Sequence, residues 1–246
     1  MTDPVILEGD AGRFEVQVFA TPYEAETAVL NLITEAVTAA IVADDKAVIC
    51  GAGGSTPKPV YERLKTLDVA WDKVTLTQVD ERFVEVDDPS SNTRMMREAV
   101  ADIASLSFLS LIQDSDQALS AQKAEAQLRS LNAGEPPVFD ITLLGMGGDK
   151  HYASIFPQHP LNADIYETDA IVVPVTATDG SIEPKLPRLT LSVSALNRSR
   201  RIVLYITGEA KLEALRQAIA TPDKTTAPIG AFLKQYPHPV DIVWVA

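Results

Sequence analysis

Hydrophobic and polar positions follow two different periods along this chain, and the switch between them predicts a series of strands and helices. Residues 14–19 alternate apolar and polar side chains, as in a strand with one exposed face. Apolar runs predict further strands near residues 46–51, 74–79, 107–112, 139–145, 170–174, 189–193, 201–207 and 240–245. Helical spacing predicts helices near residues 57–67, 92–103, 116–132, 209–220 and 227–235.

A clear helix start follows the first predicted strand. Thr21, Pro22 and Glu24 supply an N-cap, a first-turn proline and a capping-box glutamate, and they predict a helix that reaches about Ala43. Because helices separate the strands, the crossovers should be right-handed and the sheet mainly parallel, with helices covering both faces. Residues 174–187, which begin and end with proline, are expected to form an excursion on the surface.

Composition limits the number of domains. The chain has 246 residues, of which 46% are hydrophobic and 22% charged, so it is long enough for one substantial core. No long Ser/Gly linker and no repeat of fixed period divides it. The sequence therefore predicts an α/β fold and a single domain over residues 1–246.

Charge and cysteine usage bear on partners and compartment. The formal net charge of -13 argues against nucleic acid and against an anionic membrane as partners, because both require basic surface. Residues 1–8 lack the basic start and apolar run of a signal peptide, and we expect no apolar run near the roughly 18 residues that span a bilayer. Cys50, the only cysteine, lies in an apolar run, which fits a reducing, cytoplasmic setting. No Cys/His spacing indicates a metal site.

The first glycine-rich loop follows the predicted strand at 46–51 and has the chemistry of a phosphate site. Gly53 and Gly54 let backbone N–H groups approach an oxyanion, and Ser55 and Thr56 add hydroxyl donors before a helix that we expect to open at Thr56 or Pro57. The loop has neither the Lys of a Walker motif nor the third glycine of a dinucleotide fingerprint. A plain strand-to-helix turn with a threonine cap is the alternative.

The second glycine-rich loop follows the strand predicted at 139–145. Gly147 stands beside Asp149 and His151, and histidine is the side chain best suited to take a proton from water near neutral pH. In an open α/β sheet, ligands bind outside the carboxyl ends of the strands, where both loops are placed. A purely structural or exposed histidine is the alternative.

Three cations stand next to predicted strands or helices. Arg82 follows Asp80 at one strand end, where it could bind phosphate or carboxylate through two hydrogen bonds. Arg188 and Lys211 stand at the edges of later apolar segments. Each of the three could equally be surface charge, but an acidic chain that binds an anion must provide cations locally.

Five ordered motifs carry a family resemblance that runs from about residue 14 to the C-terminus. The motifs are Gly53-Gly54-Ser55-Thr56-Pro57; Asp80-Glu81-Arg82 with Ser91-Asn92 and Met95 or Met96; Gly145-Met146-Gly147-Gly148-Asp149 with His151-Tyr152-Ala153-Ser154-Ile155-Phe156-Pro157; Pro187-Arg188-Leu189-Thr190-Leu191; and Gly208 with Lys211. In this order they resemble the 6-phosphogluconolactonase family.

The resemblance implies hydrolysis of 6-phospho-D-glucono-1,5-lactone to 6-phosphogluconate without a cofactor, on the fold shared with glucosamine-6-phosphate deaminases and ribose-5-phosphate isomerases. It implies His151 as the general base and Asp149 or Asp80 as its carboxylate partner. The oxyanion would be met by loop N–H groups or by Arg82. Substrate would be held by Gly53, Gly54, Ser55, Thr56, Arg82, Gly147, Arg188 and Lys211.

Two positions depart from the Asp-Gly-His-Thr usual in that family, because this chain has Lys150 and Tyr152 on either side of His151. A glycine at the first position suggests a positive φ, which would cost a lysine about 1 kcal/mol. Lys150 could add a cation near the substrate, and Tyr152 could change the fit. A glucosamine-6-phosphate deaminase and a noncatalytic sugar-phosphate sensor are the alternatives. The run from Ser154 to Pro157 lacks the deaminase's Asn-Glu-Pro.

Overall fold

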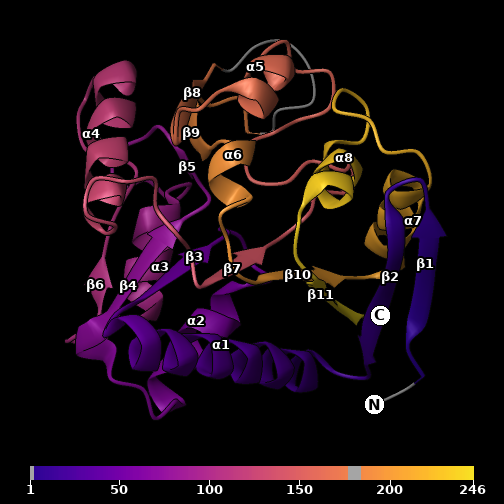
Figure 1. The fold of residues 1–246 in the computed structure, drawn as a ribbon, viewed down its shortest axis with the longest axis horizontal. Coiled ribbons are helices and arrows are strands. Elements are labelled where there is room, and N and C mark those ends of the chain that lie inside the picture. Colours follow the sequence, from indigo (N-terminus) through magenta and orange to yellow (C-terminus); the bar gives the residue numbers. More distant parts are fainter. Residues whose placement is uncertain (1–2, 177–183) are drawn as a thin grey trace.

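A computed structural model describes residues 3–176 and 184–246, and an eight-stranded sheet forms its centre (Figure 1). Its strands, in spatial order, are β1 (Val5–Gly9), β2 (Gly12–Phe19), β11 (Val240–Val245), β10 (Ile202–Thr207), β7 (Ile141–Leu144), β3 (Ala47–Gly51), β4 (Val74–Gln78) and β6 (Ser107–Phe108). The edge pair β1–β2 is antiparallel and the other neighbours are parallel. The predicted mainly parallel sheet is confirmed.

Helices cover both faces of this sheet. α1 (Pro22–Asp44) and α2 (Lys58–Arg63) lie below it in Figure 1, on the same side as α3 (Asn92–Ala99). Above it lie α4 (Gln117–Ser130), α5 (Asn162–Glu167), α6 (Val193–Leu196), α7 (Glu209–Ala220) and α8 (Pro228–Gln235). Successive residues of β3 alternate between two apolar cores, since Ile49 packs in the core with α1 whereas Val48 and Cys50 pack in the other. The strand is therefore apolar on both faces, as parallel strands between helix layers are.

The capping signals place the start of α1 correctly. The Thr21 hydroxyl accepts from the Glu24 N–H, the Glu24 carboxylate accepts from the Thr21 N–H, and the helix ends with Asp45 at φ 58°. By length and composition alone, α1 could cross a membrane, contrary to the sequence expectation. Residues such as Val29 and Ile33 pack against the sheet, as in a core helix.

A second, three-stranded antiparallel sheet was not expected from the sequence. β9 (Arg188–Leu191) pairs with β5 (Asp80–Arg82) on one side and β8 (Val172–Val175) on the other. Segments 170–174 and 189–193 are strands as predicted, but they join this small sheet instead of the central one. Its register places Arg82 opposite Arg188. Side chains that are distant in sequence are thereby brought to one place.

Other differences are local. β1, α5 and α6 were not predicted, and the strand expected at 107–112 has only two residues. The helix expected to open at Thr56 or Pro57 begins at Lys58, and a short 3₁₀ turn at Leu64–Thr66 extends it. A second 3₁₀ turn, Trp71–Lys73, precedes β4. Residues 177–183 of the expected surface excursion lie outside the described residues.

Candidate active site

The two glycine-rich loops and the second sheet meet around one pocket of about 230 Å³. The loops follow β3 and β7, and Lys211 follows β10, so the pocket lies at the carboxyl ends of parallel strands, as expected for this architecture. Its lining includes these residues predicted from the sequence: Gly53, Gly54, Ser55, Thr56, Asp80, Arg82, Gly147, His151, Arg188 and Lys211. The predicted set is therefore assembled, with Asp149 beside it.

His151 is held by a carboxylate and by an aromatic ring. Its Nδ1 lies 2.5 Å from the Asp149 Oδ1, and its ring stacks on Phe156 with centroids 4.4 Å apart. Burial alone would raise the pKa of Asp149, but the hydrogen bond and the charge interaction with His151 outweigh it and lower that pKa below its usual value. Within the described residues no hydrogen bond engages Nε2, so that nitrogen remains available to a water molecule.

The loop that carries His151 is tight. A Cβ on Gly147 would lie 2.2 Å from the His151 Nδ1 and 2.4 Å from the Asp149 Oδ1, so only glycine fits beside this pair. The Gly147 N–H donates to the His151 carbonyl at 2.9 Å. Gly147 therefore serves the site through its missing side chain, while its N–H maintains the loop.

The two unusual residues of this loop do not line the pocket. Lys150 has a φ of 76°, so the left-handed turn expected for a glycine is retained with a lysine in it. Tyr152 is fully buried, stacks on Phe232 at 4.9 Å and contacts the Tyr166 hydroxyl at 3.4 Å. Its ring packs in the core, so the larger side chain is accommodated there.

The first loop presents unused donors. Neither Ser55 nor Thr56 makes a hydrogen bond within the described residues, and α2 has no side-chain cap. The threonine cap expected for a plain strand-to-helix turn is therefore not formed. A Cβ on Gly53 would lie 1.9 Å from the Asn92 Oδ1, so the loop approaches α3 as closely as a glycine allows.

Arg188 and Asp80 form a buried pair in the second sheet. Arg188 is only 3% exposed, its Nη1 lies 3.8 Å from the Asp80 Oδ2, and its guanidinium lies over the Phe156 ring at 5.1 Å. Burial lowers the pKa of Arg188. The Asp80 Oδ2 also accepts from the Ser154 hydroxyl at 2.5 Å, and no described hydrogen bond joins Asp80 to His151. Of the two candidate carboxylates, Asp149 is the one in contact with the imidazole.

The pocket also contains residues that the sequence did not single out as functional. Asn92 lies against the first loop and Tyr205 lines the pocket from β10, where burial raises the pKa of Tyr205 to about 12. Asn92 carried a signal, because it belongs to one of the five motifs, but Tyr205 lies in an ordinary apolar strand. Lys211 also lines the pocket, and burial lowers its pKa. Within residues 3–176 and 184–246, no group of three His, Cys, Asp or Glu side chains could hold a metal ion.

This α/β fold places a His–Asp pair and three cations around one pocket at the carboxyl ends of parallel strands, an arrangement typical of enzymes that act on small anions. The chain belongs to the family described as glucosamine-6-phosphate isomerases/6-phosphogluconolactonase, whose model matches residues 20–244. The family resemblance drawn from the five motifs is confirmed.

Individual relatives agree with the family. A 6-phosphogluconolactonase of Caulobacter vibrioides is 38% identical, with 94% of this chain and 97% of that protein covered. One of Rhizobium meliloti is 34% identical, with 93% and 97% covered. The crystal structure of a 6-phosphogluconolactonase from Shewanella baltica superimposes with a TM-score of 0.85 at 34% identity, covering 94% of this chain and 97% of that one.

Proposed function

We propose that this protein hydrolyses 6-phospho-D-glucono-1,5-lactone to 6-phospho-D-gluconate, the second step of the oxidative pentose phosphate pathway. The observation that carries the proposal is the His151–Asp149 pair at the edge of a pocket lined by three cations. The names of the curated relatives support the choice of substrate. The proposal includes a single domain over residues 1–246, no cofactor and a cytoplasmic setting.

In the proposed mechanism, His151 acts as a general base through Nε2. It takes a proton from water as the oxygen attacks the lactone carbonyl, and it returns that proton to the ring oxygen when the ester bond breaks. Asp149 keeps the imidazole oriented through Nδ1 and stabilises its charged form. Because the Gly147 N–H is occupied, the oxyanion is left to the other N–H groups of the loop.

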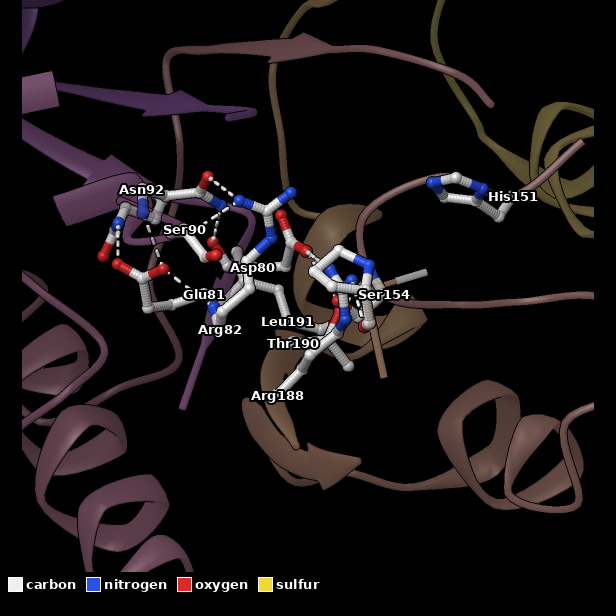
Figure 2. A network of polar contacts seen from close by, with 12 residues as sticks. Asp80, Glu81, Arg82, Ser90, Asn92, His151, Ser154, Arg188, Thr190 and Leu191 are labelled. Atoms are coloured by element: carbon white, nitrogen blue, oxygen red, sulfur yellow. Dashed lines mark hydrogen bonds and ion pairs between the residues drawn. The ribbon is translucent and has the colours of Figure 1, made fainter. Parts of the chain in front are cut away.

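The phosphate group is assigned to the first loop and the three cations. The Ser55 and Thr56 hydroxyls make no hydrogen bond to any described residue, and Arg82, Arg188 and Lys211 line the same pocket. Charge-assisted hydrogen bonds to phosphate are about twice as strong as neutral ones, which suits a chain whose overall charge repels anions. Figure 2 shows Arg82 and Asn92 together, with His151 apart on its own loop, an arrangement that suits a phosphate end and a hydrolytic end.

The test is the rate of lactone loss with purified protein, compared with the spontaneous rate in the same buffer. His151→Ala should lower kcat by about 10²–10⁴-fold, because positioned proton transfer contributes that much. Arg82→Ala and Arg188→Ala should chiefly raise KM. Unchanged turnover in His151→Ala would remove this residue from the mechanism.

Two alternatives give other results in the same assays. A glucosamine-6-phosphate deaminase would release ammonia from that substrate, but the run from Ser154 to Pro157 contains no glutamate to act with His151. A sensor would bind 6-phosphogluconate and hydrolyse nothing. Since Lys150 and Tyr152 lie outside the pocket lining, they give no structural reason for lost chemistry.

A further inference from the structure

Asn92, at the start of α3, contacts three parts of the pocket although it is only 2% exposed. Its Oδ1 accepts from the Arg82 Nη1 at 3.1 Å, and its Nδ2 donates to the Asp80 carbonyl at 3.0 Å. The same Oδ1 lies where a Cβ on Gly53 would be. Figure 2 shows the Asn92 side chain between Arg82 and Asp80 of the second sheet, and the same side chain packs against Gly53 of the first glycine-rich loop.

The Glu81 carboxylate fixes the backbone of Asn92. This carboxylate is fully buried, and its Oε1 accepts from the Asn92 N–H at 2.8 Å and from the Arg82 N–H at 2.7 Å. Its Oε2 accepts from the Thr93 N–H at 2.5 Å, the Thr93 hydroxyl at 2.6 Å and the Gln78 amide at 2.9 Å. A buried carboxylate that receives several N–H groups of a helix start is strongly fixed. Asn92 consequently has a single defined position.

Asn92 and Ser90 engage only one nitrogen of the Arg82 guanidinium. Both of its side-chain hydrogen bonds within the described residues come from Nη1, to the Ser90 carbonyl at 2.7 Å and to Asn92. Among the described residues, Nε is buried without a hydrogen-bond partner and Nη2 makes no hydrogen bond. The Nε–Nη2 edge is thus left for a ligand, and this edge can bind a phosphate through two parallel hydrogen bonds.

We infer that Asn92, held by Glu81, is a positioning residue that fixes the Nε–Nη2 edge of Arg82 and the Gly53 loop as one anion-binding unit. This inference rests on the proposed function for the identity of the anion. Asn92 acts by occupying Nη1 and by packing against Gly53, so that the arginine and the loop approach the phosphate from a constant direction. Pre-organisation of this kind raises affinity by lowering the entropy lost when the ligand binds.

The test is a double-mutant cycle of Asn92→Ala and Arg82→Ala, measured by calorimetric binding of 6-phosphogluconate and, separately, of inorganic phosphate. Asn92→Ala should weaken binding about tenfold, the value of one hydrogen bond to a charged group, and raise KM with little change in kcat. In the Arg82→Ala background the same substitution should have a clearly smaller effect, because Asn92 then has no guanidinium to hold and only its packing against Gly53 remains.

A control variant and a second variant at Asn92 distinguish a loss of affinity from a general loss of stability. Thr21→Ala removes the capping box of α1 far from Arg82, so it should lower the melting temperature without changing affinity. Asn92→Asp keeps the shape but places a carboxylate against Arg82, and it should also weaken phosphate binding.

The positioning role is overturned if the effects of Asn92→Ala and Arg82→Ala on affinity are additive. It is also overturned if Asn92→Asp binds phosphate as tightly as the unaltered protein. A protein that binds phosphate with the predicted coupling but does not hydrolyse the lactone would contradict the proposed function and leave the role of Asn92 supported.

Discussion

The half-buried Asp149 carboxylate is stabilised in its charged form by His151, so the stability of the protein should depend on acid pH. The pKa of Asp149 is lowered in the folded state, so the fold favours the ionised carboxyl. The resulting stabilisation is fully present above the unfolded pKa of about 3.9 and is lost as the pH falls through the lower folded value.

The expected outcome is a stability difference between the unaltered protein and Asp149→Asn that shrinks below about pH 4. The amide of the variant cannot titrate, so its free energy of unfolding lacks this pH-dependent contribution. Urea denaturation of both proteins between about pH 3 and pH 6 measures the difference. A difference that stays constant over this range would contradict the assigned direction of the shift.

Lys211 lies in the pocket, where burial disfavours its charged form and lowers its pKa. A larger fraction of its amine is neutral at a given pH than in the unfolded chain, so it should be modified by an acylating reagent at a lower pH than it is after unfolding. Bound 6-phosphogluconate should protect it by pairing with the ammonium. Mass spectrometry of labelled peptides checks both statements, and labelling that is unaffected by ligand would place Lys211 outside the phosphate site.

At the scale of elements, the loop after β7 keeps a left-handed turn with Lys150 at φ 76°. The sequence suggested this strain from the family's glycine at the same place, and the structure confirms the positive φ. Hydrogen bonds within the loop maintain this shape, including the one from the Lys150 N–H to the Gly147 carbonyl at 3.0 Å.

Lys150→Gly should raise the free energy of unfolding by about 0.5–1 kcal/mol, the relief of strain less the added entropy of the unfolded chain. Lys150→Ala is the matched control, because it removes the same side chain but retains a Cβ. Chemical denaturation compares the two variants. A glycine variant less stable than the alanine variant by about 0.5–1 kcal/mol would mean that the backbone at this position is not strained.

At the scale of the whole molecule, the pocket is lined from both sheets and from the start of α7. A ligand that contacts all three should stabilise them together. At a concentration of 6-phosphogluconate about 100 times its Kd, the free energy of unfolding should rise by about 2.7 kcal/mol. Thermal unfolding with and without the compound tests this expectation, with Arg82→Ala as the variant that should lose most of the gain.

The sequence by itself determined what depends on neighbours along the chain. The capping box at Thr21 and Glu24, the apolar strands and the two glycine-rich loops all act over a few residues, so their patterns predicted helices, strands and strand-end loops. The order of the motifs indicated the family, and the carboxyl-edge rule placed both loops at one site.

Only the tertiary structure decided what depends on residues distant in sequence. Asp149, and not Asp80, lies in contact with His151. Arg82 lies opposite Arg188 in a second sheet, and Tyr152 is buried in the core. Asn92 lies between Arg82 and Gly53. Pairings of this kind follow from strand register and from which face of an element is buried, and local periodicity does not specify the partner across a sheet.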